Sequence, residues 1–306
     1  MEASAVKKHG NRIYLDRTDT IIRGFTYVSM SLAAFFGIMP FLLIIGSSFT
    51  TEESIRRTGF TLIPKVFSMQ AYDIIFRSPE SLVGSYALTI ILTAAGVSVG
   101  LFAIAMTGYA LSRKDFPYRN VISFYIYFTS LFSAGLVPFY LMMVQTYKLR
   151  DSYLAVLLPL MLSPWLIILM KNFAKAIPHE VTESGKIDGA SDFKIFVNII
   201  LPMLTPALAT VGLFLAISYW NEWYYSSLFL GSSVKYKPLQ YQLYQVVNKI
   251  EALRNSYAGS VVHIEDLPGE TLKMATAVLA TGPIIFAYPF IQKYFVSGLT
   301  VGAVKG

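Results

Sequence analysis

Cysteine is absent from the 306 residues, which excludes disulfide bonds, thiolate metal ligands and cysteine nucleophiles. Histidine is nearly as scarce: His9, His179 and His263 are far apart in the sequence and lack the spacing of metal ligands. The sequence also lacks the Gly-x-x-x-x-Gly-Lys-Ser/Thr loop, the Gly-x-Ser-x-Gly elbow and the His-Glu-x-x-His motif. We therefore expect neither a metal site nor an enzyme that hydrolyses ATP itself.

Charged residues are scarce as well. They make up 14% of the chain, whereas hydrophobic residues make up 55% and the mean hydropathy is +0.54. Soluble domains usually carry about 25% charged residues. The apolar residues are gathered in blocks of about twenty or more, which as helices can cross a hydrocarbon core roughly 30 Å thick. The sequence therefore predicts an all-α, polytopic membrane protein.

Six blocks are long enough, or nearly so, to be membrane-spanning helices. They are Phe25–Phe49, Leu82–Leu111, Val121–Val144, Tyr153–Met170, Leu204–Leu230 and Met274–Phe295. The first block is too long for the apolar region of a signal peptide and shows no small-residue cleavage site, so it is expected to remain as the first span. The predicted organisation is a tail over 1–24, a membrane domain over 25–296 and a second tail over 297–306.

Each block is expected to be a helix in spite of its prolines, because backbone amides in lipid have to be hydrogen-bonded within their own segment. Kinks are expected at Pro138, Pro159, Pro164, Pro206, Pro283 and Pro289. Ordinary bundle packing is favoured over a functional hinge at any one of them.

The distribution of Lys and Arg predicts the orientation. If the N-terminus is cytoplasmic, the inside segments hold fourteen of the 25 Lys and Arg residues and the longer outside segments hold the other eleven. Both termini are therefore expected in the cytoplasm. The net charge of +7 is then a signal of membrane topology. No basic stripe interleaved with aromatic residues indicates nucleic-acid binding.

Two long segments, 50–81 and 231–273, are expected on the outside. The second mixes apolar and polar residues at helical spacing, which favours a short surface helix, although a plain connector has the same composition. A docking surface for an external partner is a further interpretation.

The segment between the fourth and fifth blocks predicts a sharp elbow of two helices. Pro178 suits a first helical turn, and Glu180 and Glu183 lie where acidic groups favour the helix dipole. Gly189 can adopt positive φ, and Ser191 or Asp192 can cap a second helix. Small residues would let another protein's backbone approach closely.

The elbow carries a spaced motif. Glu183, Gly189, Ile199, Leu201 and Pro202 match the cytoplasmic signature of binding-protein-dependent ABC importer permeases: Glu-Ala-Ala, three residues, Gly, nine residues, Ile, one residue, Leu-Pro. Ser184-Gly185 replaces Ala-Ala, which lowers helix propensity at Gly185 by about 1 kcal/mol. The sequence thus resembles these permeases along nearly its whole length. The branch that imports oligosaccharides and complex carbohydrates, which includes maltose-type permeases, is resembled by residues 187–210, the YWNEW of 219–223 and the tail over 294–306.

The resemblance implies a type I importer subunit in the bacterial cytoplasmic membrane. Its elbow would be the coupling helix, with Glu183, Ser184, Gly185, Asp188, Gly189 and Ala190 in a cleft of a separate ATPase dimer that binds ATP and Mg²⁺. Closure of that dimer would move the helices from inward-facing to outward-facing. Further implied partners are a second, unlike permease and an extracytoplasmic solute-binding protein. The tail over 298–306 would reach the ATPase interface or be a frayed end.

The solute path is predicted at the outer end of the fifth block. Polar groups at that depth usually face a bundle interior, and aromatic faces beside hydrogen-bonding groups suit sugars, which singles out Trp220, Asn221, Glu222 and Trp223. The aromatic residues could equally form an interfacial belt. A permease for another solute remains an alternative. A secondary transporter is less favoured, because neither an internal repeat nor a midplane carboxylate pair is found.

Overall fold

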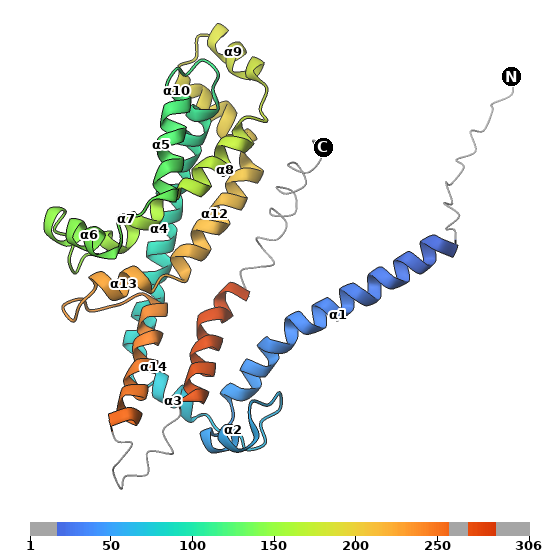
Figure 1. Cartoon of the computed structure of the whole chain (residues 1–306), viewed down its shortest axis with the longest axis vertical. Coiled ribbons are helices and arrows are strands. Elements are labelled where there is room, and N and C mark those ends of the chain that lie inside the picture. The colour runs from blue at the N-terminus through green and yellow to red at the C-terminus, as the bar shows by residue number, and fades with distance from the viewer. Residues whose placement is uncertain (1–16, 257–268, 286–306) are drawn as a thin grey trace, which may run out of the picture.

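The computed structural model describes residues 17–256 and 269–285, and within these ranges the chain is helical apart from loops (Figure 1). One isolated β-bridge joins Thr50 to Phe67. The predicted all-α class is confirmed. Both predicted tails, 1–24 and 297–306, lie largely or wholly outside the described residues.

The described helices fall into a simple sequential order along the chain. They are α1 (Arg17–Ser48), α2 (Glu52–Thr58), α3 (Gln70–Ile75), α4 (Pro79–Ser112), α5 (Arg119–Leu131), α6 (Leu136–Leu141), the π-helical η1 (Met142–Thr146), α7 (Leu154–Met161), α8 (Pro164–Ala174), α9 (His179–Ile187), α10 (Asp192–Ile195), the π-helical η2 (Phe196–Ile200), α11 (Leu201–Met203), α12 (Thr205–Trp220), α13 (Tyr224–Phe229), α14 (Leu239–Ser256) and a helix over 270–285.

Several of these helices are candidate membrane spans. The residues Ile21–Ser48 of α1 and the whole of α4 are individually long and apolar enough to cross a membrane. Three further candidates are bent pairs: Arg119–Leu131 with Leu136–Thr146 at 113°, Leu154–Met161 with Pro164–Ala174 at 41°, and Asp192–Met203 with Thr205–Trp220 at 83°. The sixth predicted block, Met274–Phe295, begins within the helix over 270–285 and continues beyond the described residues.

The middle blocks are therefore interrupted, and none of them is one continuous helix with kinks. The third block breaks over 132–135, where Gly135 has a φ of +87°. The fourth breaks before Pro164, where Ser163 is extended because the residue that precedes a proline avoids the helical region. The chain also bends at Leu204, two residues before Pro206. Pro164 and Pro206 then occupy first helical turns, where a missing N–H costs nothing.

The other described prolines at which kinks were predicted do not break a helix. Pro138 lies in the first turn of α6, whereas Pro159 and Pro283 lie inside continuous helical stretches. The helix is therefore not interrupted at these three positions, where kinks were predicted. Pro289 is outside the described residues. The fifth block also ends earlier than predicted, because α12 stops at Trp220 and the chain turns before α13.

The main core lies where α4, α8 and the segment from α10 to α12 meet. Its most buried members include Ile104, Met170, Ile195, Ile200 and Val211. Close approach of α4 to α8 requires Gly108, since a Cβ at that position would lie 2.8 Å from Met170 Cγ. The resulting contact fixes α8, and with it the start of α9, against α4.

A second core lies at the end of the molecule opposite α9. It joins α3, the first turns of α4, α14 and the helix over 270–285, and we call this region the distal cap (Figure 1). Leu239 and Leu243 of α14 are buried there beside Tyr72 and Leu272. The two predicted outside segments thus pack on each other, and the second contains a helix of 18 residues rather than a plain connector.

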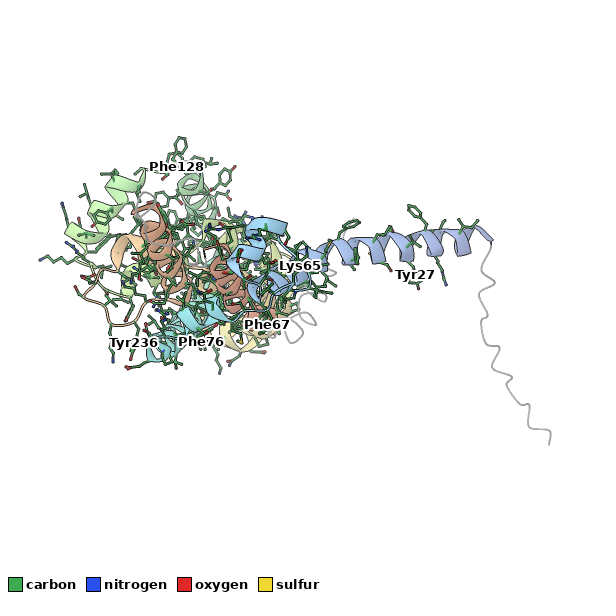
Figure 2. All side chains as sticks on the ribbon, turned by 90° about the horizontal axis from the view of Figure 1, so that it is seen from below. Tyr27, Lys65, Phe67, Phe76, Phe128 and Tyr236 are labelled. Atoms are coloured by element: carbon green, nitrogen blue, oxygen red, sulfur yellow. The ribbon has the colours of Figure 1, made fainter. Side chains whose placement is uncertain are left out.

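Helix α1 stands apart from the other helices (Figures 1 and 2). No residue of its most apolar stretch is buried against the rest of the described chain. Phe25 is 75% exposed and Tyr27, labelled in Figure 2, is 72% exposed. Such a helix needs lipid or another protein as its apolar surroundings.

Candidate coupling site

The predicted elbow is a helix, a turn and a helix at one end of the bundle (Figure 1). Helix α9 begins directly after Pro178 and has Glu180 in its first turn. Gly189 adopts a φ of +75° just after α9 ends. The Ser191 hydroxyl then accepts a hydrogen bond from the backbone N–H of Lys194 at 3.3 Å and caps α10.

One face of α9 packs on the protein itself. Thr182 and Gly185 are buried, and the Tyr109 and Thr182 hydroxyls are hydrogen-bonded at 3.3 Å. A Cβ at Gly185 would lie 3.0 Å from Ile195 Cγ1. Gly185, which was expected to face a partner, therefore lies against α10.

The opposite face of the elbow is open. Glu183, Ser184, Asp188 and Gly189 are exposed, and a Cβ at Gly189 would meet no other atom of the described chain within 4 Å, whereas Ala190 is half-buried. Two large apolar side chains are exposed on the elbow as well. Ile187 is 85% exposed and Phe193 is 60% exposed, and neither residue belongs to the motif.

An ion network joins the elbow to the loop between α4 and α5. Arg113 donates to Asp192 Oδ1 at 2.6 Å and from Nε to Asp115 Oδ1 at 2.9 Å. Lys186 Nζ lies 3.1 Å from Asp115 Oδ2 and 3.7 Å from Asp192 Oδ1. Residues of α9 and α10 are thus tied to the end of α4 by four charged groups.

The network shifts the pKa values of Asp115 and Arg113. The Arg113 hydrogen bond, supported by Lys186, holds the pKa of Asp115 well below its usual range. The same bond to Asp115 is the main reason why the pKa of Arg113 is raised. Arg113 and Asp115 are consequently both charged at neutral pH.

Two of the predicted path residues are engaged within the protein. Trp220 donates from Nε1 to the Ala280 carbonyl at 3.0 Å. Glu222 is 6% exposed and caps α13, since its carboxylate accepts from the backbone N–H of Tyr225 at 2.5 Å and from Ser226 N–H at 3.3 Å. These contacts give Glu222 a local structural role.

The other two predicted path residues are accessible. Trp223 is 41% exposed and its ring lies 4.8 Å from that of Tyr244, centroid to centroid. Asn221 is exposed and accepts from Gln240 Nε2 at 3.3 Å. Trp223, Gln240 and Tyr244 line a groove of about 280 Å³, which we call the aromatic groove, between α14 and the helix over 270–285.

Residues 100–301 match the protein family described as "Binding-protein-dependent transport system inner membrane component". The matched residues cover more than half of the chain and include the whole elbow. The chain belongs to this family. It is a permease, a non-catalytic membrane component of an ABC system that works with an ATPase and a binding protein.

Relatives of this permease extend along almost its full length. It is 38% identical to the polygalacturonan/rhamnogalacturonan transport system permease protein YtcP of Bacillus subtilis (strain 168), over 97% of this chain and 99% of that protein. It is 28% identical to the arabinooligosaccharides transport system permease protein AraQ of the same organism, over 92% and 94%. A crystal structure of a bacterial ABC transporter involved in import of the acidic polysaccharide alginate contains a chain that is 29% identical, with a TM-score of 0.74 and coverage of 92% and 99%.

Sequence reasoning about the permease missed the residues that hold its elbow in place. Arg113 and Asp192 are 79 positions apart, so no local pattern joins them. The exposed Ile187 and Phe193 did carry a signal, because both lie within a few residues of a turn glycine in an otherwise polar segment.

Proposed function

We propose that the permease forms the translocation path for an oligosaccharide in the bacterial cytoplasmic membrane, with α9 acting as the coupling helix for a separate ATPase. The supporting observation is the elbow, whose open face carries Glu183, Gly189 and Ile187 while its inner face is bound to the end of α4. A surface that is exposed, short and rigidly backed is suited to a groove in another protein.

The ion network supports a route by which a displacement of the elbow would reach the membrane helices. Arg113 directly follows the last residue of α4, and it is bonded to both Asp115 and Asp192. Bidentate arginine–carboxylate pairs fix geometry as well as charge. Closure of an ATPase dimer on ATP and Mg²⁺ would therefore displace α9, α10 and α4 together and turn the path from inward-facing to outward-facing.

In this arrangement the elbow end and both termini are cytoplasmic and the distal cap is outside, where the binding protein delivers the solute. Six spans are proposed: α1, α4, the three bent pairs and the segment that starts with the helix over 270–285. The cytoplasmic tails proposed at 1–24 and 297–306 follow from the same orientation.

A second, unlike permease is proposed as the neighbour in the membrane. Most apolar side chains of α1 are exposed in the described chain, among them Phe35, which is 61% exposed, and Phe36, which is 65% exposed. Ala33 and Gly37 are four residues apart on the same helix, a spacing that allows close contact between membrane helices. Helix α1 would pack on the second permease and complete the pair.

The proposal of a carbohydrate solute is supported by the relatives and by the aromatic groove. The relatives are named for transport of polygalacturonan or rhamnogalacturonan, of arabinooligosaccharides and of alginate. In the groove, Trp223 and Tyr244 offer aromatic faces and Gln240 offers an amide. Sugars present apolar C–H faces and hydroxyl groups, so this set can stack on one and hydrogen-bond to the other. We propose Asn221 and Trp223 as path residues, with Trp220 and Glu222 holding the surrounding helices in place.

Photocrosslinking in the assembled importer tests the coupling role and the orientation together. A benzophenone side chain placed at Ile187 or Phe193 should crosslink to the ATPase subunit, whereas one at Ile63, which is 81% exposed near the distal cap, should not. Crosslinks to the ATPase from Ile63 but not from Ile187 would reverse the orientation and refute the proposal.

Uptake of labelled oligosaccharides by the reconstituted importer with its binding protein tests the solute class. We expect Trp223→Ala to weaken apparent affinity about fivefold, because stacking on an aromatic ring contributes about 1 kcal/mol, and Trp223→Phe to retain most of it. Uptake of a different solute class, unaffected by either variant, would contradict the carbohydrate assignment while leaving the coupling role intact.

A further inference from the structure

A large basic cavity lies at the elbow end of the bundle. Its volume is about 670 Å³, and it is bordered by the end of α4, the start of α5, the end of α8 and the start of α9. We call it the basic pocket. Its charged lining consists of Arg113, Lys114, Arg119, Lys171, Lys175 and a single carboxylate, Glu180, with His179 beside it.

Most of these cations have no acidic partner. Arg113 is neutralised by the ion network. Lys171 Nζ, which is half-buried, donates to Ser123 Oγ at 2.6 Å, and Arg119 donates to the Arg113 carbonyl at 3.2 Å. Within residues 17–256 and 269–285, no carboxylate forms an ion pair with Lys171, Arg119 or Lys175. Lys175 and Arg119 moreover repel Lys171.

Such a cluster destabilises the protein unless an anion offsets it, because like charges around a partly buried site disfavour one another. The positive-inside rule accounts for Lys and Arg near the cytoplasmic membrane surface. It does not account for their convergence on one cavity. The volume lies within the range of small-molecule sites, about 300–1,000 Å³, and far exceeds the size of one acidic side chain from a partner protein.

The surroundings of the basic pocket suit a ligand that is part ionic and part apolar. Leu111 and Ile177 add apolar lining. Helix α5 begins at the pocket, and none of its thirteen residues is buried in the described chain. Val121 and Phe124, which follow the lining residue Asn120, are 68% and 66% exposed. An acyl chain could therefore lie along α5 while its headgroup occupies the pocket.

We propose that the basic pocket binds a phosphate-bearing anion, either the headgroup of an anionic phospholipid or a soluble phosphate ester. Basic pockets between membrane helices on the cytoplasmic side are suited to phosphate headgroups, and arginine is suited to bidentate phosphate contacts. The apolar flank along α5 favours the lipid. Occupancy would bring α4, α8 and α9 together around one ligand and so stiffen the base of the elbow.

Native mass spectrometry of the assembled importer in detergent tests this inference. The probes are phosphatidylglycerol, phosphatidylcholine, glycerol 3-phosphate and inorganic phosphate. We expect retention of phosphatidylglycerol but not of phosphatidylcholine. The double variant Arg119→Gln with Lys175→Gln should weaken that retention roughly 30-fold, about fivefold for each charge removed. Lys194→Gln removes an exposed charge of the same elbow end that does not line the pocket and is the matched control.

The outcomes separate the sources of the phosphate. Binding of glycerol 3-phosphate as tight as that of the lipid, lost in the same double variant, supports the site with a soluble ligand. Equal loss of lipid in the Lys194→Gln control, or unchanged retention in the double variant, overturns the proposal. If the double variant does not assemble, lipid retention is measured in Lys175→Gln alone. This single variant should assemble, because Lys175 is exposed and makes no ion pair within the described chain. An acidic ATPase side chain found in the pocket without bound phosphate would also refute it.

Discussion

Gly189 provides the sharpest test of the elbow. Its φ of +75° costs an L-residue with a side chain about 1–2 kcal/mol. The penalty comes from the backbone alone, because a Cβ at this position would contact no other atom of the described chain within 4 Å. Since every 1.4 kcal/mol is tenfold, Gly189→Ala should lower the population of the native turn roughly 5- to 30-fold relative to competing conformations.

The side chain chosen at this position should set the severity of the defect. Asn tolerates the left-handed region better than Ala, and Trp adds bulk in the open space where a partner would dock. We expect uptake to fall in the order Gly189→Asn, Gly189→Ala, Gly189→Trp. ATP hydrolysis in the assembled importer should persist but no longer drive uptake, while membrane insertion and subunit assembly stay normal.

Gly185→Ala is the matched control. An alanine there gains about 1 kcal/mol in helix propensity, but its Cβ would lie 3.0 Å from Ile195 Cγ1 in the core. The two effects oppose one another, so we expect nearly normal stability and uptake. Normal coupling in Gly189→Trp, or equal defects in Gly185→Ala and Gly189→Ala, would refute the idea that the left-handed turn and its open face carry the coupling function.

Two other changes test the contacts around the elbow and α13. Asp115→Asn should destabilise the elbow by about 1 kcal/mol, the range for partly exposed ion pairs. Because the folded pKa of Asp115 is depressed, this difference from wild type should be constant near neutral pH and shrink as the pH falls below about 4, which hydrogen exchange of α9 can follow. Glu222→Ala should lose the cap on Ser226 and cost about 1–2 kcal/mol in thermal unfolding, whereas Glu222→Gln should keep uptake. Loss of uptake in Glu222→Gln with unchanged stability would instead place that carboxylate in the solute path.

Hydropathy predicted the membrane class and the position of most apolar blocks, because it measures composition over a window. It could not reveal that the third block folds back at Gly135 or that α12 ends at Trp220. Those breaks depend on single residues and on packing between distant segments. The hydropathy averaged over a window is the same for a straight helix and for a broken helix of the same composition.

The elbow was predictable because its signals are local: Pro178 before the helix, Gly189 at the turn and Ser191 as a cap. Its anchoring was not, since the bond from Arg113 to Asp192 joins residues far apart in the sequence. The cap that Glu222 forms on α13 was not predictable either, because its partners become visible only once the turn before α13 is known.

Helix α4 extends from the elbow end of the bundle to the distal cap. It is 34 residues long without a break, or about 51 Å at 1.5 Å per residue. Arg113 follows one end, while Thr89 accepts from Leu239 N–H at 2.8 Å and Tyr86 donates to Leu279 nearer the other. A rod of this length that tilts by about 10° carries its far end through roughly 9 Å. In the proposed mechanism, a modest tilt at the elbow would thus become a displacement of roughly 9 Å on the opposite side of the bilayer.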